Sequence, residues 1–219
     1  MNQSQPHLWL GASSAKAQVT CVFVHGRGQS PEAMVDAVLS RLTAVQVAFC
    51  LPRATGASWY GARAIDPLTE ITRAELTAAC GCIEDAVQAA RKAAPGMPLV
   101  VAGFSQGACL TLEWLCSGGT TPDAMIAFTG CRVGPPPDLR APPPLQGLPI
   151  YLTGGDADPW IPVSAFADAV ASLGQAGAAL RTDLFPGRAH EVSAPEIAML
   201  DLTLQDLAAG RPVTFGEPR

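Results

Sequence analysis

Short, wholly apolar runs alternate along the chain with longer segments in which apolar residues recur every three or four positions. The short runs are rich in β-branched side chains and are bounded by Gly or Pro, which is typical of strands buried on both faces of a parallel sheet. We expect such strands at residues 19–25, 45–51, 99–104, 125–129, 150–153 and 179–185.

The longer segments predict helices between these strands. Ser30-Pro31-Glu32 supplies an N-cap, a proline at the first helical position and an early acid, so a helix is expected to continue to about Leu42. Further helices are expected at residues 69–94, 106–116, 163–173 and 195–208. This alternation predicts an α/β fold with a mostly parallel sheet and helices on both faces, in one domain over residues 1–219.

Two segments show neither a continuous apolar run nor apolar residues at three- or four-residue spacing. Residues 53–68 contain Gly56, Gly61 and Pro67 and predict a long loop, a kind of segment that is often functional in compact domains. The Pro-rich residues 132–149 predict a second loop, which is too short to form a separate lid domain.

The charge pattern excludes several partners. The formal net charge is −5 and the pI is about 5.1, without a cluster of Lys or Arg. A basic face is the expected footprint of nucleic-acid binding, and clustered cations that of anionic lipid, so we expect neither partner. Residues 1–10 lack the features of a secretory signal, and no uninterrupted apolar stretch of about 18 residues predicts a membrane-spanning helix.

The seven cysteines are an odd number, and most lie within apolar runs. Free Cys in such runs behaves as a small hydrophobic residue. Cys80 and Cys82 form the only close pair, and neither a second pair nor a nearby His completes a metal site. We therefore expect reduced thiols, no bound metal and a cytoplasmic location.

The motif Gly103-Phe104-Ser105-Gln106-Gly107 follows a predicted buried strand and opens a predicted helix. This is the context of a nucleophile elbow, in which a tight strand-to-helix turn lifts the serine hydroxyl out of the sheet. The turn is so tight that the positions two residues on either side must be small. Ser105 is therefore the predicted nucleophile.

A serine hydroxyl needs a base, and the chain offers His7, His25 and His190. In this type of fold the order is Ser, acid, His, and only His190 follows Ser105. His190 is therefore the predicted base. His25 is expected to brace the loop in which it lies.

The orienting acid is expected after the strand at residues 150–153. Asp156 and Asp158 both qualify there, and spacing does not decide between them, since Asp156 could cap the turn instead. For the oxyanion, the expected donors are the backbone N–H of Gln106 and, from the loop after the first predicted strand, that of Arg27.

At this point the chain resembles the phospholipase/carboxylesterase family of α/β-hydrolases. The matching segments follow family order from about residue 19 to residue 208; they are His25-Gly26-x-Gly28, Ser58-Trp59, Gly103–Gly107, Gly155-Asp156-x-Asp158-Pro159-x-Ile161-Pro162-Val163 and Gly187-x-x-His190-Glu191. The resemblance implies that the acid is the Asp directly before Pro, which is Asp158. It also implies no lid, no metal or organic cofactor, and frequent homodimers.

Trp59 lies in the loop that, by the resemblance, lines the acyl pocket. Trp160 is a second candidate for substrate binding, with core packing as the alternative. The Arg27 guanidinium either faces an anionic acyl group or lies in solvent.

Thioesterase-like members of the family carry an apolar residue at the position of Arg27 and an acid at that of Gln29, so this chain is more similar to the bacterial carboxylesterase branch. We therefore predict a serine carboxylesterase for small to medium acyl esters. Acyl-thioester or lysophospholipid hydrolysis is the main alternative. A non-catalytic binding module would be expected to lose Ser, His or Asp, and dienelactone hydrolase-like proteins use Cys at the elbow.

Overall fold

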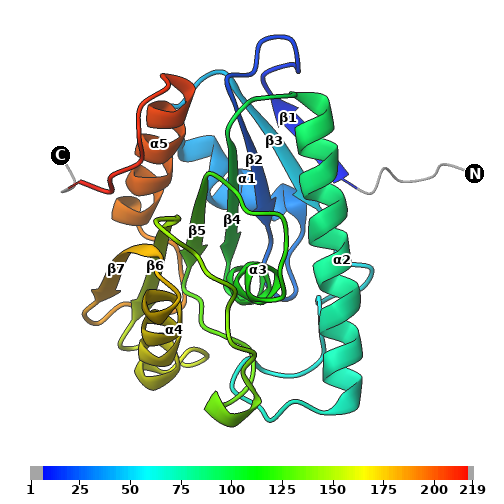
Figure 1. Ribbon diagram of the computed structural model, residues 1–219, viewed down its shortest axis with the longest axis vertical. Coiled ribbons are helices and arrows are strands. Elements are labelled where there is room, and N and C mark those ends of the chain that lie inside the picture. Colours follow the sequence, from blue (N-terminus) through cyan, green and yellow to red (C-terminus); the bar gives the residue numbers. More distant parts are fainter. Residues whose placement is uncertain (1–6, 217–219) are drawn as a thin grey trace, which may run out of the picture.

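The computed structural model describes residues 7–216, and within them seven strands form one sheet in the order β1-β3-β2-β4-β5-β6-β7 (Figure 1). The strands are β1 (His7–Gly11), β2 (Val19–Val24), β3 (Val47–Pro52), β4 (Leu99–Phe104), β5 (Ala124–Phe128), β6 (Pro149–Gly155) and β7 (Ala179–Phe185). All neighbouring pairs are parallel except β1 and β3. The α/β fold with a mostly parallel sheet is therefore confirmed.

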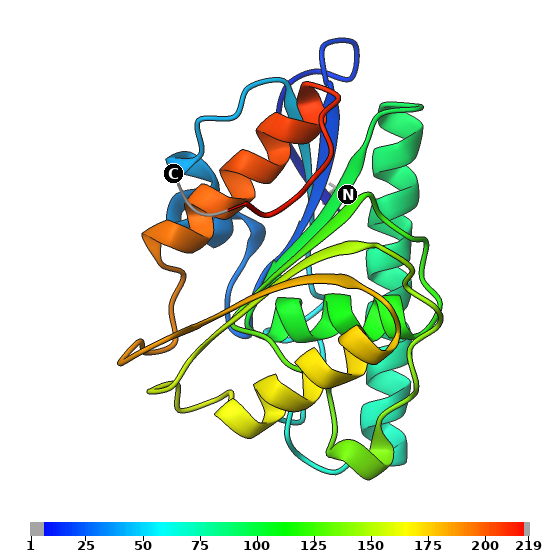
Figure 2. The same cartoon turned by 60° about the vertical axis from the view of Figure 1, so that its left-hand side comes forward.

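Helices cover both faces of this sheet (Figure 2). In the described residues they are α1 (Pro31–Ala37), α2 (Glu70–Ala93), α3 (Gln106–Cys116), α4 (Val163–Gln175) and α5 (Ala194–Ala208), with short 3₁₀ turns η1 (Leu39–Arg41) and η2 (Pro136–Asp138). Helices α2, α3 and α4 share one apolar core with the sheet, while α1 and α5 pack on the opposite face.

Strand β4 shows how the pattern builds the two cores. Leu99 and Val101 contribute to the α2–α4 side, whereas Val100, Ala102 and Phe104 contribute to the α1–α5 side. Successive side chains of a strand point to opposite faces, so a continuous apolar run supplies both cores at once. This central position fixes the end of β4, where Ser105 follows.

The structure departs from the predicted elements in two places. Strand β1 was not predicted; it lies at the sheet edge, and Trp9 is partly exposed, so its sequence lacks a continuous apolar run. The first helix ends at Ala37 rather than near Leu42, because Val38 leaves the helical conformation at φ −125°. The Ser40 hydroxyl donates to the Asp36 carbonyl at 2.9 Å, a local bond that competes with helix continuation.

The two predicted loops contact each other at the carboxyl ends of the strands (Figure 1). The Gly134 N–H donates to the Ala64 carbonyl at 2.7 Å, and the Leu68 N–H donates to Asp138 Oδ2 at 2.8 Å. Buried Arg132 anchors the second loop to α3 through Glu113, at 2.5 Å. The Pro-rich loop thus stays part of the same packed unit and frames the end of the sheet where ligands bind in open α/β folds.

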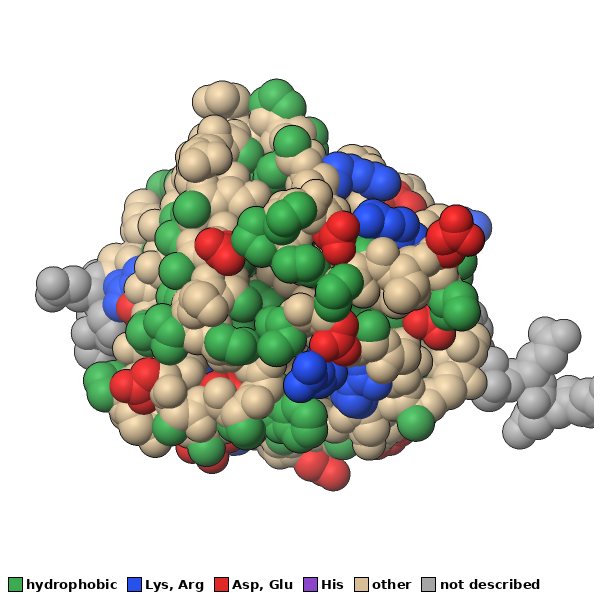
Figure 3. All heavy atoms as spheres, turned by 90° about the horizontal axis from the view of Figure 1, so that it is seen from below, with side chains coloured by type: hydrophobic (Ala, Val, Ile, Leu, Met, Phe, Trp, Pro, Cys, Tyr) green, Lys and Arg blue, Asp and Glu red, His purple; other side chains and the backbone are tan. Residues whose placement is uncertain are grey.

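The molecular surface carries both signs of charge. On the face seen in Figure 3, acidic and basic side chains lie close to one another among apolar ones. Between residues 7 and 216, no helix is both long and apolar enough to cross a bilayer. The segment for which no secretory signal is predicted includes residues 1–6. For these six residues the prediction lies outside the described part of the chain.

Candidate active site

Ser105 occupies a strained turn between β4 and α3. Its φ of 55° and ψ of −120° are rarely adopted by a residue with a side chain, and such strain is typical of functional turns. A Cβ on Gly103 would come within 2.7 Å of the Gly107 backbone, and one on Gly107 would overlap the carbonyl oxygens of Val24 and His25. Both glycines are therefore needed for the turn, as the sequence predicted.

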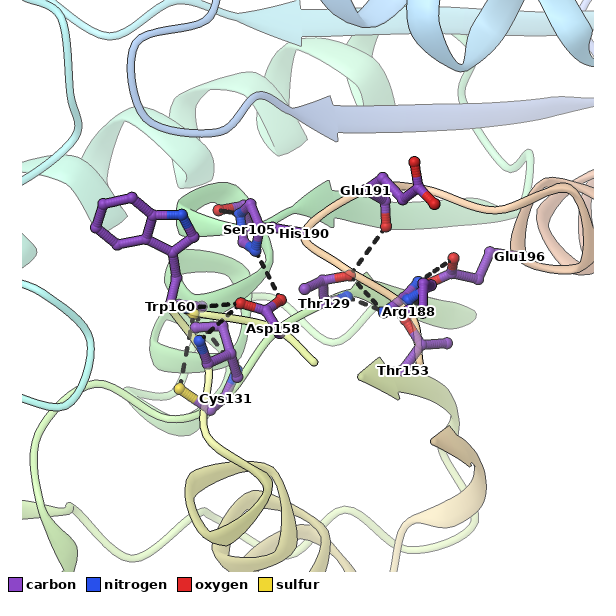
Figure 4. Close-up of polar contacts among 12 residues, drawn as sticks. Ser105, Thr129, Cys131, Thr153, Asp158, Trp160, Arg188, His190, Glu191 and Glu196 are labelled. Atoms are coloured by element: carbon purple, nitrogen blue, oxygen red, sulfur yellow. Dashed lines mark hydrogen bonds and ion pairs between the residues drawn. The ribbon is translucent and has the colours of Figure 1, made fainter. Parts of the chain in front are cut away.

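His190 lies between the Ser105 hydroxyl and the Asp158 carboxylate (Figure 4). Its Nε2 is 2.7 Å from Ser105 Oγ, and its Nδ1 is 2.7 Å from Asp158 Oδ2. The other carboxylate oxygen of Asp158 accepts the backbone N–H groups of Trp160 at 2.7 Å and Ile161 at 3.0 Å. The Asp158 side chain has no exposed surface, and that of His190 is 19% exposed, so the acid is shielded while the imidazole reaches the cavity.

Asp156, the alternative acid, has a different contact. Its Oδ1 accepts the Gly187 N–H at 2.5 Å, which ties the end of β6 to the turn that leads from β7 to His190. The residue is exposed, and the His190 ring meets Asp158 instead. The arrangement matches the turn-capping role that the sequence left open for Asp156.

Arg27 and Gln106 line a cavity of about 210 Å³ together with Ser105 and His190. Gln106 is the first residue of α3, where backbone N–H groups have no partner within the helix and the helix dipole favours negative charge. In the Arg27 loop, Gly28 has a φ of +68° and its N–H donates to the Ala57 carbonyl at 2.6 Å. The two predicted oxyanion donors thus belong to segments that line the same cavity as the Ser105 hydroxyl.

His25 braces the loop that carries Arg27. Its Nδ1 lies 2.8 Å from the Gly26 carbonyl, which only accepts, and its Nε2 lies 3.2 Å from the Ala54 N–H, which only donates. These partners require a neutral ring protonated on Nδ1. Burial lowers the pKa of His25 below its usual value, which also favours the neutral form.

Trp59 is not placed where the sequence predicted. It is absent from the described lining of the cavity, and its side chain is buried against His25 with ring centroids 4.8 Å apart. Its indole N–H donates to the His25 carbonyl at 2.8 Å. Trp59 therefore packs against His25 at the start of the Arg27 loop, whereas its neighbour Tyr60 lines the cavity.

The side chain of Gln106 has a role that the sequence analysis missed. Its Oε1 accepts the Trp59 N–H at 3.0 Å and its Nε2 donates to the Tyr60 carbonyl at 2.8 Å. One buried amide thus fastens the loop of residues 53–68 to the first turn of α3. The signal available in the sequence was an uncharged amide within the elbow, but its partners are 46 and 47 residues away.

Apolar side chains form much of the cavity wall. They come from the loop of residues 53–68, from α3 and from the segment between β6 and α4, and they are Tyr60, Ala64, Cys109, Trp160 and Ile161. Trp160 is 56% exposed and lines the cavity, so it does not pack in the core.

All seven cysteines are free thiols. Cys109 Sγ lies 4.0 Å from Cys131 Sγ, and this contact together with burial raises the pKa of Cys131 well above its usual value. In residues 7–216, no three His, Cys, Asp or Glu side chains are grouped as metal ligands would be.

A buried polar network anchors the loop that carries His190 (Figure 4). Arg188 forms an ion pair with Glu196 of α5, and its Nη2 donates to Thr129 Oγ1 at 2.8 Å. Glu196 also accepts the Thr153 hydroxyl and, at 2.6 Å, the Ser193 N–H. The network joins the ends of β5 and β6 to α5. It was not predicted from the sequence, although Ser193-x-x-Glu196 is the pattern of a helix-capping box.

The hydroxyl is hydrogen-bonded to the imidazole, and the imidazole to a buried carboxylate. This is the arrangement by which an alcohol is made nucleophilic. On this fold, with the serine at a strand-to-helix elbow, the arrangement defines an α/β-hydrolase. A family profile described as phospholipase/carboxylesterase matches residues 7–206, and the chain belongs to this family.

Solved structures agree with this assignment. A phospholipase/carboxylesterase from Dyadobacter fermentans shares 28% identity and superposes with a TM-score of 0.80, covering 92% of this chain and 96% of the other. The carboxylesterase of Bacillus cereus has the same fold at 14% identity, with a TM-score of 0.74 and coverage of 94% and 96%. Among curated proteins no match was found. The family and its relatives indicate a hydrolase of the carboxylesterase type.

Proposed function

We propose that the protein is a serine carboxylesterase that hydrolyses small to medium acyl esters, with Ser105 as nucleophile, His190 as base and Asp158 as orienting acid. The observation that carries this proposal is the pair of 2.7 Å contacts that His190 makes, one to Ser105 Oγ and one to Asp158 Oδ2. Membership in the phospholipase/carboxylesterase family supports the reaction class.

In the acylation step, Ser105 Oγ attacks the ester carbonyl carbon while His190 Nε2 takes the hydroxyl proton. Negative charge then develops on the former carbonyl oxygen, and the backbone N–H groups of Arg27 and Gln106 stabilise it. Buried Asp158 accepts a hydrogen bond from the Nδ1–H group, which holds the ring in the reactive tautomer and stabilises its cation. His190 then protonates the leaving alcohol, and the carbon–oxygen bond to it breaks.

In the deacylation step, His190 takes a proton from water, and the resulting hydroxide equivalent attacks the acyl-enzyme carbonyl. Collapse of the second tetrahedral intermediate breaks the bond to Ser105 Oγ, which recovers its proton from His190. The carboxylic acid leaves and the free serine is restored. Each step needs only groups that line the cavity or touch His190.

The size of the cavity supports the choice of small to medium acyl chains. At about 210 Å³ it is smaller than the range typical of drug-sized ligand sites, roughly 300–1,000 Å³. Ile161 and Ala64 contribute apolar wall, and Trp160 stands at its exposed part.

Hydrolysis of p-nitrophenyl esters from acetate to palmitate tests this function. Wild type should act best on the short and medium esters, and Ser105→Ala should lower kcat by roughly 10³-fold or more, because the nucleophile is lost. Ser117→Ala, at the exposed end of α3, serves as the matched control and should keep wild-type rates.

Equal weak rates for wild type and Ser105→Ala at every chain length would refute the proposal. A clear preference for palmitate, or for thioesters over oxygen esters of the same acyl group, would instead favour the thioesterase or lysophospholipase alternatives.

A further inference from the structure

The charged lining of the cavity contrasts with the charge of the whole protein. The chain has a formal net charge of −5. The described lining of the cavity nevertheless contains two arginines, Arg27 and Arg63, and no carboxylate. A cavity with cationic walls in an acidic protein favours ligands of negative charge, because low-dielectric walls concentrate the local field.

The two arginines are not equivalent. Arg63 is paired with Asp66. The Asp66 carboxylate accepts hydrogen bonds from Arg63 Nε at 3.1 Å, from its Nη2 at 2.9 Å and from its backbone N–H at 2.9 Å. This pairing lowers the pKa of Asp66, so the carboxylate that compensates Arg63 is ionised at neutral pH. Arg63 therefore adds little net charge to the cavity.

Arg27 has a different set of partners. Its Nη1 donates to the Gly61 carbonyl at 3.1 Å, its Nη2 donates to the Ala62 carbonyl, and its guanidinium carbon lies 6.0 Å from the Tyr60 ring centroid. Within residues 7–216 it forms no ion pair with a carboxylate. Two of the five N–H donors of a guanidinium are thus used, and no carboxylate is paired directly with it.

We propose that the Arg27 guanidinium binds a carboxylate carried by the ester substrate, so that the preferred substrates are esters that bear a negative charge. The proposal rests on the esterase function above and adds the substrate class. A guanidinium without a directly paired carboxylate is free to pair with one from the substrate, and its planar fork matches carboxylate geometry. The Gly61 and Ala62 carbonyls hold the side chain in place before substrate arrives, which limits the entropy lost on binding.

Neutral and charged esters of similar shape provide the test. The charged set is monoethyl succinate, glutarate and adipate, and the neutral set is ethyl 4-methylpentanoate, 5-methylhexanoate and 6-methylheptanoate, all followed by acid release. Wild type should favour the best charged ester over its neutral counterpart by about tenfold in kcat/KM, the effect of one charge-assisted hydrogen bond reduced by solvent exposure. Between about 0.01 M and about 1 M salt this ratio should fall, because screening shortens the reach of exposed charges.

Arg27→Met removes the charge and leaves the backbone N–H in place, so it should bring the charged-to-neutral ratio close to one. Arg27→Lys keeps the charge without the planar fork and should give an intermediate ratio. Arg63→Met is the matched control and should change the ratio by less than about threefold, because Asp66 already compensates Arg63. The ratio is read within each variant, so a general loss of activity does not alter it.

Several outcomes would overturn the proposal. They are a wild-type ratio near one, a ratio that does not respond to salt, or a loss of preference in Arg63→Met but not in Arg27→Met. If Arg27→Met does not fold, the wild-type salt dependence and Arg27→Lys still decide.

Esters of acetate with glycolate or 3-hydroxypropanoate place the carboxylate on the alcohol side. An Arg27-dependent preference for these, or for the monoethyl esters, supports the proposal and identifies the side of the ester that Arg27 contacts. Hydrolysis of the neutral esters without any charge preference would refute the inference and leave the esterase function intact. Failure to hydrolyse any ester would refute that function itself.

Discussion

The two walls of the candidate active site are braced by different chemistry. On the His190 side, a buried ion pair between Arg188 and Glu196 links the ends of two strands to α5. On the Arg27 side, the bracing groups are uncharged: the Gln106 amide, the Trp59 indole and the neutral ring of His25. The His190 loop and the Arg27 loop are thus held by a charged and a neutral framework, respectively.

The difference predicts how substitutions in each wall should affect stability and activity. Removing one member of a buried ion pair leaves an uncompensated charge, which is strongly destabilising. Removing a neutral hydrogen-bonding group leaves unsatisfied main-chain groups at a smaller cost. The His190 wall should therefore respond to substitution with large losses of stability, and the Arg27 wall with smaller losses and a change in transition-state stabilisation.

The largest effect on activity is expected at Asp158, the residue of the His190 wall that contacts the imidazole. Asp158→Asn should lower kcat by roughly 10³- to 10⁴-fold, because an amide does not hold the imidazole in the reactive tautomer. Steady-state kinetics on a short-chain ester measures this. Asp156→Asn is the matched control, since Asp156 caps the Gly187 turn, and an equal loss in both variants would remove Asp158 from its proposed role.

Breaking the charged brace should have the largest effect on stability. Glu196→Gln leaves the Arg188 guanidinium without its partner in a site where the two side chains are 6% and 0% exposed, and about 3–5 kcal/mol of the free energy of unfolding should be lost. Urea denaturation measures this loss. The double variant Arg188→Met, Glu196→Leu should recover much of it, and a double variant as unstable as Glu196→Gln would show that the unpaired charge is not the cause.

A medium effect is expected from the neutral brace. Gln106→Ala keeps the backbone N–H but leaves the Trp59 N–H and the Tyr60 carbonyl without partners, at a cost of about 1–3 kcal/mol for a buried unsatisfied group. Loosening of this wall should also lower kcat/KM, measured on a neutral ester. Gln88→Ala on the outer surface of α2 is the control. Wild-type kinetics in Gln106→Ala would show that the position of the loop does not affect catalysis.

The smallest effect concerns pH. Burial lowers the pKa of His25 below its usual value of 6.5, so the neutral ring is the form that the fold stabilises. Its contribution to stability is fully present above about pH 6.5 and is lost as the pH falls through the lowered pKa, because the unfolded chain binds the proton more readily. His25→Gln should therefore show a flatter decline of the urea midpoint between about pH 7 and pH 5. Parallel declines in both proteins would mean that His25 does not titrate on unfolding.

Local patterns in the sequence were sufficient to predict most of the fold and the order of the candidate catalytic residues. The elbow around Ser105 is specified by neighbouring glycines, and the strands by continuous apolar runs, so both can be read within a few positions. The single His after Ser105 left no alternative base. The choice of Asp158 over Asp156 came from family resemblance, because two carboxylates so close in sequence differ only in their direction.

What the sequence did not predict depends on contacts between distant segments. Trp59 points toward His25 rather than into the cavity, and this direction follows from packing against a residue 34 positions away. The Arg188–Glu196 pair is only eight residues apart, yet its value as a brace depends on Thr129 and Thr153 at the ends of other strands. Strand β1 is defined by its pairing with β3 at the sheet edge, where an apolar run is not required.

The close approach at Gly107 has a consequence for how this site can change over time. Because a side chain there would collide with the Val24 and His25 carbonyls, helix α3 rests directly on the end of β2. The serine turn and the Arg27 loop therefore cannot shift independently of each other, because their backbones are in direct contact. Inherited variation in one should be accompanied by compensating variation in the other, and a designer who grafts this elbow onto another scaffold would have to transplant the end of β2 with it.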